Sequence, residues 1–104
     1  MTHYNPNNLT DPQSFQAEYP ETVKAINPFY YNTVEVGYYV RIRSANEYFW
    51  VQVREVNGDN VTGEVYYELG TNIYKIGDTL TFSKSFQFDI YDPQVFNLIP
   101  GIDV

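Results

Sequence analysis

Apolar and polar residues alternate with a period of two along residues 38–90, the pattern of β-strands that bury one face. The most regular stretch is a hairpin within residues 48–69, in which YFWVQVREV and VTGEVYYEL flank the turn sequence NGDN. We therefore predict a strand on each side of this turn. The residues predicted to be buried here and in the later strands are Phe49, Val51, Val53, Val65, Leu80 and Phe82.

The register of this hairpin can be predicted by matching the apolar faces of its strands. A two-residue turn at Gly58-Asp59 would place Val53 opposite Glu64 and mix core with solvent positions. A loop of one more residue, ending at Asn60, avoids this and brings Arg54 opposite Glu64 on the outer face. The buried pairs are then Val53 with Val65, Val51 with Tyr67, and Phe49 with Leu69.

Other strands and turns follow from the same alternation. Residues 38–43 form a strand with Tyr38, Val40 and Ile42 inward and with Tyr39, Arg41 and Arg43 outward. Later strands place Leu80 and Phe82 inward, and residues 86–90 carry Phe86, Phe88 and Ile90 on one side. The predicted fold class is therefore all-β, a small antiparallel barrel or sandwich, of which we favour the barrel.

Three segments are predicted along the chain. Residues 1–10 are polar and form a disordered arm. Residues 11–33 form a helical or irregular docking segment, in which Asp11 caps a short helix that begins at Pro12 and is closed by Pro20. Residues 34–104 form the barrel domain and include a C-terminal helical turn that begins at Asp92. The apolar stripe by which the docking segment reaches the barrel comprises Phe15, Tyr19, Val23 and Ile26.

Composition and charge narrow the functional classes. The chain has 104 residues, the size of one domain, and a net charge of −7 with only six basic residues. This balance argues against nucleic acid as a partner, because binding to phosphate requires lysines and arginines. We expect Arg41, Arg43 and Arg54 to pair with Glu64 and Glu68, and we expect no binding to duplex DNA at physiological salt.

No feature of the sequence predicts a membrane segment or a signal peptide. We therefore expect a soluble protein without a membrane partner. The expected location is the cytoplasm, or the virion or host cytoplasm if the source is a virus.

Catalysis has little support in the residue types present. There is no cysteine, and the only histidine, His3, lies in the predicted arm. A nucleophile–histidine arrangement or a zinc site is therefore not expected, and neither is a cofactor. Asp78, Asp89 and Asp92 could meet at one barrel end as a hydrolase-like carboxylate site, but turn and capping roles account for Asp78 and Asp92. We expect a protein that is not an enzyme.

An outward strip of aromatic residues is the better candidate site. Tyr39, Tyr48, Trp50 and Tyr66 fall on the outer face of strands predicted to be neighbours. A contiguous exposed aromatic patch usually marks a contact surface. The prediction is a protein- or peptide-binding module. Two alternatives stay open: the N-terminal segment, with Phe15, Tyr19, Phe29 and Tyr30, covers the strip as ordinary core, or the protein is an assembly component that forms homo-oligomers or a minor part of a viral particle.

Several motifs resemble those of a family of small uncharacterised proteins, a domain of unknown function with a Src-homology-3-like or Tudor-like barrel that occurs in bacteria and large DNA viruses. The motifs are EYFWVQV, NGDNVTG, GDTLTF and the closing Asp89-Ile90, and they cover about half of the chain. The resemblance implies the barrel fold and no catalytic residue. In Tudor-like barrels, clustered aromatics with one acid can cage a methylated lysine or arginine, and the resemblance would give that acid role to Glu64 or Glu68.

Overall fold

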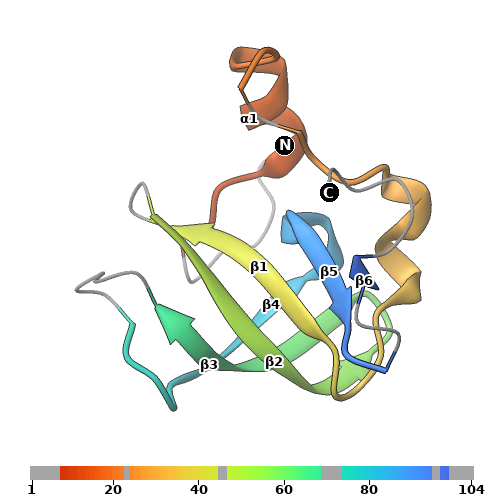
Figure 1. Cartoon of the computed structure of the whole chain (residues 1–104), viewed down its shortest axis with the longest axis vertical. Helices are drawn as coiled ribbons and strands as arrows, with labels where there is room; N and C mark the ends of the chain where they lie inside the picture. The colour runs from red at the N-terminus through yellow and green to blue at the C-terminus, as the bar shows by residue number, and fades with distance from the viewer. Residues whose placement is uncertain (1–7, 23, 45–46, 69–73, 95–96, 99–104) are drawn as a thin grey trace.

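A computed structural model describes residues 8–22, 24–44, 47–68, 74–94 and 97–98. Their strands form one six-stranded sheet in the order β4-β3-β2-β1-β5-β6, and every neighbouring pair is antiparallel (Figure 1). The strands are β1 (Tyr39–Ser44), β2 (Glu47–Asn57), β3 (Asn60–Glu68), β4 (Thr79–Ser83), β5 (Asp89–Asp92) and β6 (Asn97–Leu98). The helices are α1 (Pro12–Glu18) and two 3-10 turns, η1 (Pro28–Thr33) and η2 (Lys84–Phe86).

This topology confirms the predicted all-β antiparallel class with little helix. Strands β1 to β4 follow each other as a meander, and the chain then crosses to the opposite edge, where β5 pairs with β1. Within the described ranges, no strand pair joins β4 to β6, so the sheet is open there rather than a closed barrel. None of the described helices is long and apolar enough to cross a membrane.

The turn of the β2–β3 hairpin has two residues, Gly58 and Asp59, so the predicted three-residue loop is wrong. Asn57 lies opposite Asn60, and Gly58 has a φ of 61°. Two-residue hairpin turns require such a positive φ at the first central position, where glycine is the favoured residue. The alternation alone disfavours a two-residue turn because it places Val53 opposite Glu64, and register shifts within the strands remove that mismatch.

Two β-bulges correct the register of this hairpin. Val56 pairs with Val61 beside the turn, but a shift between Val53 and Glu55 leaves Arg54 as an extra residue in β2. A second shift, between Trp50 and Val51, leaves Tyr66 as the extra residue in β3. The pairs that replace the predicted ones are Val53 with Gly63, Val51 with Val65, and Phe49 with Glu68.

The predicted core is confirmed, because all six residues named for it are at most 5% exposed. The alternation in β2 also places Trp50 on the face opposite Val51, as predicted. Close packing explains the glycine that faces Val53. A Cβ atom at Gly63 would lie 2.8 Å from the Cγ2 atom of Val51, closer than two carbons can approach without a shift.

The described residues of the predicted arm, 8–10, are part of the fold. Leu9 is buried and bridges to Ser44, and the Thr10 N–H donates to the Arg43 carbonyl at 2.8 Å. A disordered arm is therefore wrong for these three residues, because the end of β1 offers them backbone partners. Residues 1–7 lie outside the described ranges.

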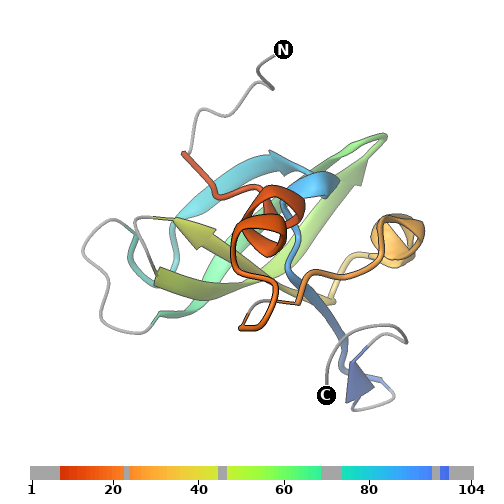
Figure 2. The same cartoon turned by 90° about the horizontal axis from the view of Figure 1, so that it is seen from above.

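Helix α1 begins and ends as predicted. The Asp11 side chain accepts from the Gln13 N–H at 3.0 Å, and the helix ends at Glu18, before Pro20. Figures 1 and 2 show α1 on one side of the sheet, over the end of β1. Of the predicted apolar stripe, Ile26 is buried, Tyr19 is 47% exposed, and Val23 lies outside the described ranges.

Two buried polar side chains hold η1 against the rest of the fold by hydrogen bonds. The Lys84 ammonium donates to the Asn32 side chain at 2.8 Å, and the Gln87 amide donates to the Tyr31 carbonyl at 3.2 Å. Lys84 and Gln87 are both buried. Because buried polar groups are costly unless they are paired, these bonds fix η1 in one position.

The predicted helical turn at Asp92 is a hairpin turn. Asp92 ends β5, its carboxylate accepts from the Gln94 N–H at 2.9 Å, and the chain returns as β6. Asp-Pro begins both helices and turns, since an aspartate carboxylate can cap either. Because Tyr91 pairs with Leu98, the segment after Asp92 forms β6, the edge strand of the sheet, rather than a helical turn.

Candidate functional site

The structure divides the predicted aromatic strip into two clusters. Tyr39 and Tyr66 lie together, with ring centroids 4.8 Å apart. Tyr48 belongs to a different cluster, where its ring meets that of Phe88 edge-on at 5.2 Å. Trp50, in register with Arg41 on β1, is half-buried rather than exposed. The strip is therefore not one continuous open surface.

The cluster around Tyr48 is covered by α1. The guanidinium of Arg43 lies 4.4 Å from the ring centroid of Phe15 and 4.9 Å from that of Tyr48. The Phe15 ring also meets Phe88 edge-on at 6.2 Å. The alternative in which the N-terminal segment covers the strip is thus confirmed at this end, through Phe15. It is wrong for Phe29, which is 83% exposed.

The outward arginines of β1 find partners other than those predicted. Arg41 forms an ion pair with Asp89, whose side chain is buried, and its guanidinium lies 4.5 Å from the Tyr48 ring centroid. Arg43 stacks on aromatic rings as described above. Only the pairing of Arg54 with Glu64 is confirmed, at 2.8 Å. The side chain of Glu68 lies outside the described part of the structure.

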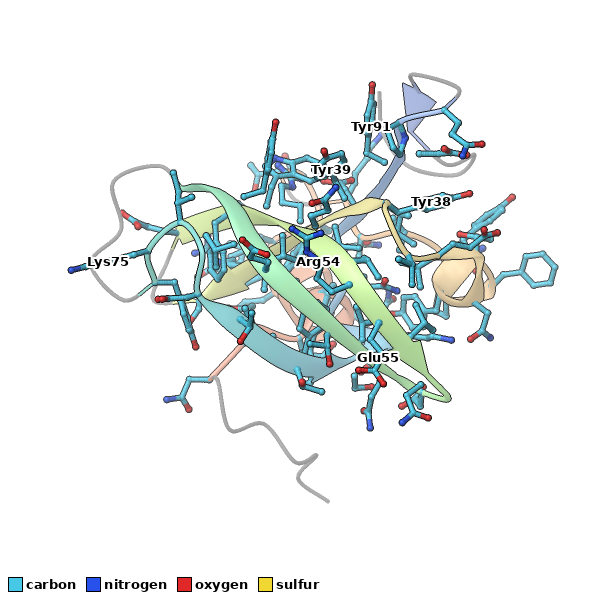
Figure 3. All side chains as sticks on the ribbon, turned by 90° about the horizontal axis from the view of Figure 1, so that it is seen from below. Tyr38, Tyr39, Arg54, Glu55, Lys75 and Tyr91 are labelled. Atoms are coloured by element: carbon cyan, nitrogen blue, oxygen red, sulfur yellow. The ribbon has the colours of Figure 1, made fainter. Side chains whose placement is uncertain are left out.

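The open cluster consists of Tyr39, Tyr66 and Tyr91, which we call the tyrosine face. These side chains come from β1, β3 and β5, and the Tyr39 ring lies 6.3 Å from that of Tyr91. Tyr66 is 58% exposed, and Tyr39 and Tyr91 are half-buried. Figure 3, seen from below, shows Tyr39 and Tyr91 close together with Arg54 beside them.

Backbone register explains why these three tyrosines meet. Tyr39 lies opposite Gln52 on one side and opposite Tyr91 on the other. Tyr66 is the extra residue of the second bulge, and its ring reaches across β2 to Tyr39. Sequence reasoning missed Tyr91 because the last strand was predicted to end at Ile90. The signal was present, since Tyr91 continues the alternation by one position.

Polar groups border the tyrosine face. Arg54 donates to one oxygen of Glu64 from both Nε and Nη2, at 3.1 and 2.8 Å. The Gln52 amide donates to the Tyr39 hydroxyl at 3.4 Å. Tyr38, in contrast, packs against the core, and its hydroxyl donates to Asp92 at 3.0 Å. A polar neighbour thus holds the Tyr39 hydroxyl, while the Tyr66 ring stays exposed.

The environment of Tyr39 raises its pKa above the ordinary value of 10.0. Burial is the main cause, because it disfavours the charged phenolate, and the neighbouring Tyr66 raises the pKa further. Arg54 acts in the opposite direction by attracting the phenolate. The pKa of Tyr38 is also raised, first by burial and then by its bond to Asp92.

Alkaline titration should reveal this shift. Native protein holds the Tyr39 proton more tightly than the unfolded chain, so the stability from this group is fully present below pH 10.0 and is lost as pH rises through its folded pKa. We expect Tyr39→Phe to reduce the loss of urea resistance above that pH. An unchanged alkaline stability curve for the variant would contradict the shift.

The predicted carboxylate site is not assembled. Asp78 accepts from the Lys75 N–H at 2.9 Å in a turn, Asp89 pairs with Arg41, and Asp92 holds Tyr38. Among the described residues, no group of three or more acidic, histidine or cysteine side chains could hold a metal ion. His3 lies outside the described ranges.

Comparisons of the chain with protein-family models, with curated proteins and with solved structures find no match.

Proposed function

We propose that this protein is a non-enzymatic module that binds a protein or peptide through the tyrosine face. The observation that carries this proposal is the Tyr39–Tyr66 pair, in which one ring is 58% exposed while its partner holds it at 4.8 Å. Tyrosine offers a large apolar ring and a polar hydroxyl, and it loses little conformational entropy on binding. These properties make it common among residues that anchor interfaces.

The proposed site is narrower than the strip predicted from sequence. Tyr48 is excluded because Phe15 and Arg43 cover it. Trp50 is excluded because the ring contacts of the tyrosine face join Tyr39 with Tyr66 and Tyr91 and do not include Trp50. Tyr91 is added. The proposed contact residues are Tyr39, Tyr66 and Tyr91, with Gln52, Arg54 and Glu64 as the polar border.

The same geometry favours a protein over nucleic acid as the partner. Arg41 and Arg54 each form an ion pair with a carboxylate, and the Arg43 guanidinium lies against the rings of Phe15 and Tyr48. The chain as a whole carries a net charge of −7. Affinity for phosphate depends on cations that are free to replace counterions. A protein or peptide can instead be bound by stacking and hydrogen bonds.

Removing the Tyr66 ring should weaken binding strongly. Partners captured from the native host with the wild-type protein would be purified and titrated calorimetrically against wild type and Tyr66→Ala. A ring at the centre of an interface typically contributes ~2 kcal/mol or more, which is a loss in affinity of roughly 30-fold. Urea melts of both proteins would confirm that the variant is folded.

Phe29→Ala is the matched control, because Phe29 is more exposed than Tyr66 and lies on η1 rather than on the tyrosine face. It should leave affinity unchanged. If Phe29→Ala abolishes binding and Tyr66→Ala does not, the interface is at η1 and the proposed site is wrong. Light scattering during size-exclusion chromatography would show whether the captured partner is a second copy of this chain.

We further propose that the sheet belongs to the class of small barrels that includes Src-homology-3-like and Tudor-like folds. In support, β2 is 11 residues long and carries two register shifts, and bulges bend strands and increase their twist. The Val65 N–H and carbonyl bond to Asp78 and Gly77 next to β4, at 2.7 and 3.0 Å, which extends the pairing of β3. An experimental structure in which further pairing joins the sheet edges would establish the barrel.

A further inference from the structure

One-electron oxidation of this protein is expected to fall mainly on aromatic side chains. The chain contains no cysteine and a single methionine, which are the residues that most oxidants attack first. It contains 11 tyrosines and one tryptophan. One-electron oxidants convert a phenol to a phenoxyl radical, and two such radicals couple through the ring carbons next to the hydroxyl. Two tyrosines can therefore be joined where those carbons are neighbours.

Tyr39 and Tyr66 meet this requirement. Their ring centroids are 4.8 Å apart with an angle of 54° between the ring planes, so the ring edges approach each other. The two phenol groups are also close enough for Tyr66 to raise the pKa of Tyr39. The coupling positions lie directly beside the phenol hydroxyls. Tyr66 is exposed, and a soluble oxidant can reach it.

We propose that Tyr39 and Tyr66 form a site of oxidative cross-linking, where a peroxidase with hydrogen peroxide joins their rings by a carbon–carbon bond. Each phenol loses one electron and its hydroxyl proton to give a phenoxyl radical. The radicals couple at ring carbons next to the oxygens, and both rings regain aromaticity when the protons on those carbons move to the oxygens. The net loss is two protons and two electrons, which reduce one hydrogen peroxide to two waters.

Other tyrosine pairs are less suited to this reaction. Among the ring contacts of the described residues, the second pair of tyrosines is Tyr39 with Tyr91, whose centroids are 6.3 Å apart. Tyr19, Tyr48 and Tyr74 have phenylalanine as their ring neighbour, and phenylalanine forms no phenoxyl radical. Among these ring contacts, the geometry therefore favours the link between Tyr39 and Tyr66.

This link would change the protein in a defined way. Tyr39 is on β1 and Tyr66 is on β3, so the new bond would tie together two strands that are separated by β2. A covalent bond between distant positions restricts the unfolded chain, as a disulfide does. It would also fix the Tyr66 ring in place. Oxidation would then stabilise the fold and set the shape of the tyrosine face.

The test is treatment of the full chain with a peroxidase and limiting hydrogen peroxide at low protein concentration. We expect dityrosine fluorescence, a monomer that has lost two hydrogen atoms, and an increased midpoint of urea unfolding. Tryptic digestion should yield residues 25–41 joined to residues 55–75, since trypsin cleaves after lysine and arginine. Fragment ions would assign the bond to Tyr39 and Tyr66.

Conservative variants make the test specific. Tyr39→Phe and Tyr66→Phe should each abolish the monomeric product, whereas Tyr91→Phe should retain it. Circular dichroism would show that all three variants are folded. The proposal is overturned if Tyr66→Phe leaves the yield unchanged, if the bond joins other tyrosines, or if the product consists of cross-linked dimers.

Discussion

Phe49→Ala should leave the protein barely folded. The Phe49 side chain is 1% exposed, lies in the central strand β2, and its ring lies 5.2 Å from that of Tyr74. Removing a buried phenylalanine ring typically costs ~3–5 kcal/mol, because transfer energy is lost and a cavity remains. That is a large part of the ~5–15 kcal/mol that holds a domain of this size together. Urea unfolding followed by circular dichroism would measure the loss.

Tyr66→Ala is the comparison on the neighbouring strand. Its ring is 58% exposed and stacks on Tyr39, and such an aromatic contact contributes ~0.5–1.5 kcal/mol. The variant should therefore unfold near the wild-type urea concentration. Equal losses for the two variants would mean that the tyrosine face is buried as firmly as the core, which would also remove the basis of the proposed function.

The faces of the strands could be predicted from the sequence because alternation is a local property. Val51 and Val53 must share a side in any extended chain, and the side that carries the apolar residues faces the core. The helix start at Asp11-Pro12 is local for the same reason, since the cap bonds to a residue two positions later. Such features need no knowledge of the rest of the fold.

Alternation alone could not decide the hairpin register, because two solutions satisfy it. A longer loop and a two-residue turn followed by a bulge both bring apolar faces together. The bulge at Arg54 has no strong residue preference, whereas Gly58 favours the short turn. The preference of glycine for the first position of a two-residue turn therefore indicates the observed register more strongly than unbroken pairing of apolar faces does. The register matters for the proposed site, because the second bulge places Tyr66 against Tyr39.

The division of the aromatic strip depended on contacts between distant residues. Nothing near Tyr48 in the sequence indicates that Phe15 and Phe88 will close over it. Nothing near Arg41 indicates Asp89, which arrives only because β5 crosses to the free edge of β1. The alternation along each strand identified the outward residues correctly. Which of these residues remain exposed was decided by the crossing of the chain from β4 to β5, on the far side of β1. Exposure is thus a property of topology rather than of one strand.

Phe88→Ala should destabilise the fold by ~3–5 kcal/mol, and it should release α1 in particular. Phe88 is fully buried, but it lies outside the main core and contacts the rings of Phe15 and Tyr48. Without the Phe88 ring, Phe15 of α1 loses the aromatic contact against which it packs. Urea melts would measure the total loss, and hydrogen exchange would report on α1, whose Tyr19 N–H bonds to the Phe15 carbonyl in the native state.

Phe29→Ala is the matched control for that experiment, since it removes the same ring from a position that is 83% exposed. A change at an exposed site usually stays within about 0.5 kcal/mol, and exchange in α1 should not change. If Phe88→Ala lowers stability while the amides of α1 stay as protected as in the wild type, Phe88 does not hold α1. The cover over Tyr48 would then rest on the stacking of Phe15 with Arg43, and Arg43→Ala should release α1 in its place.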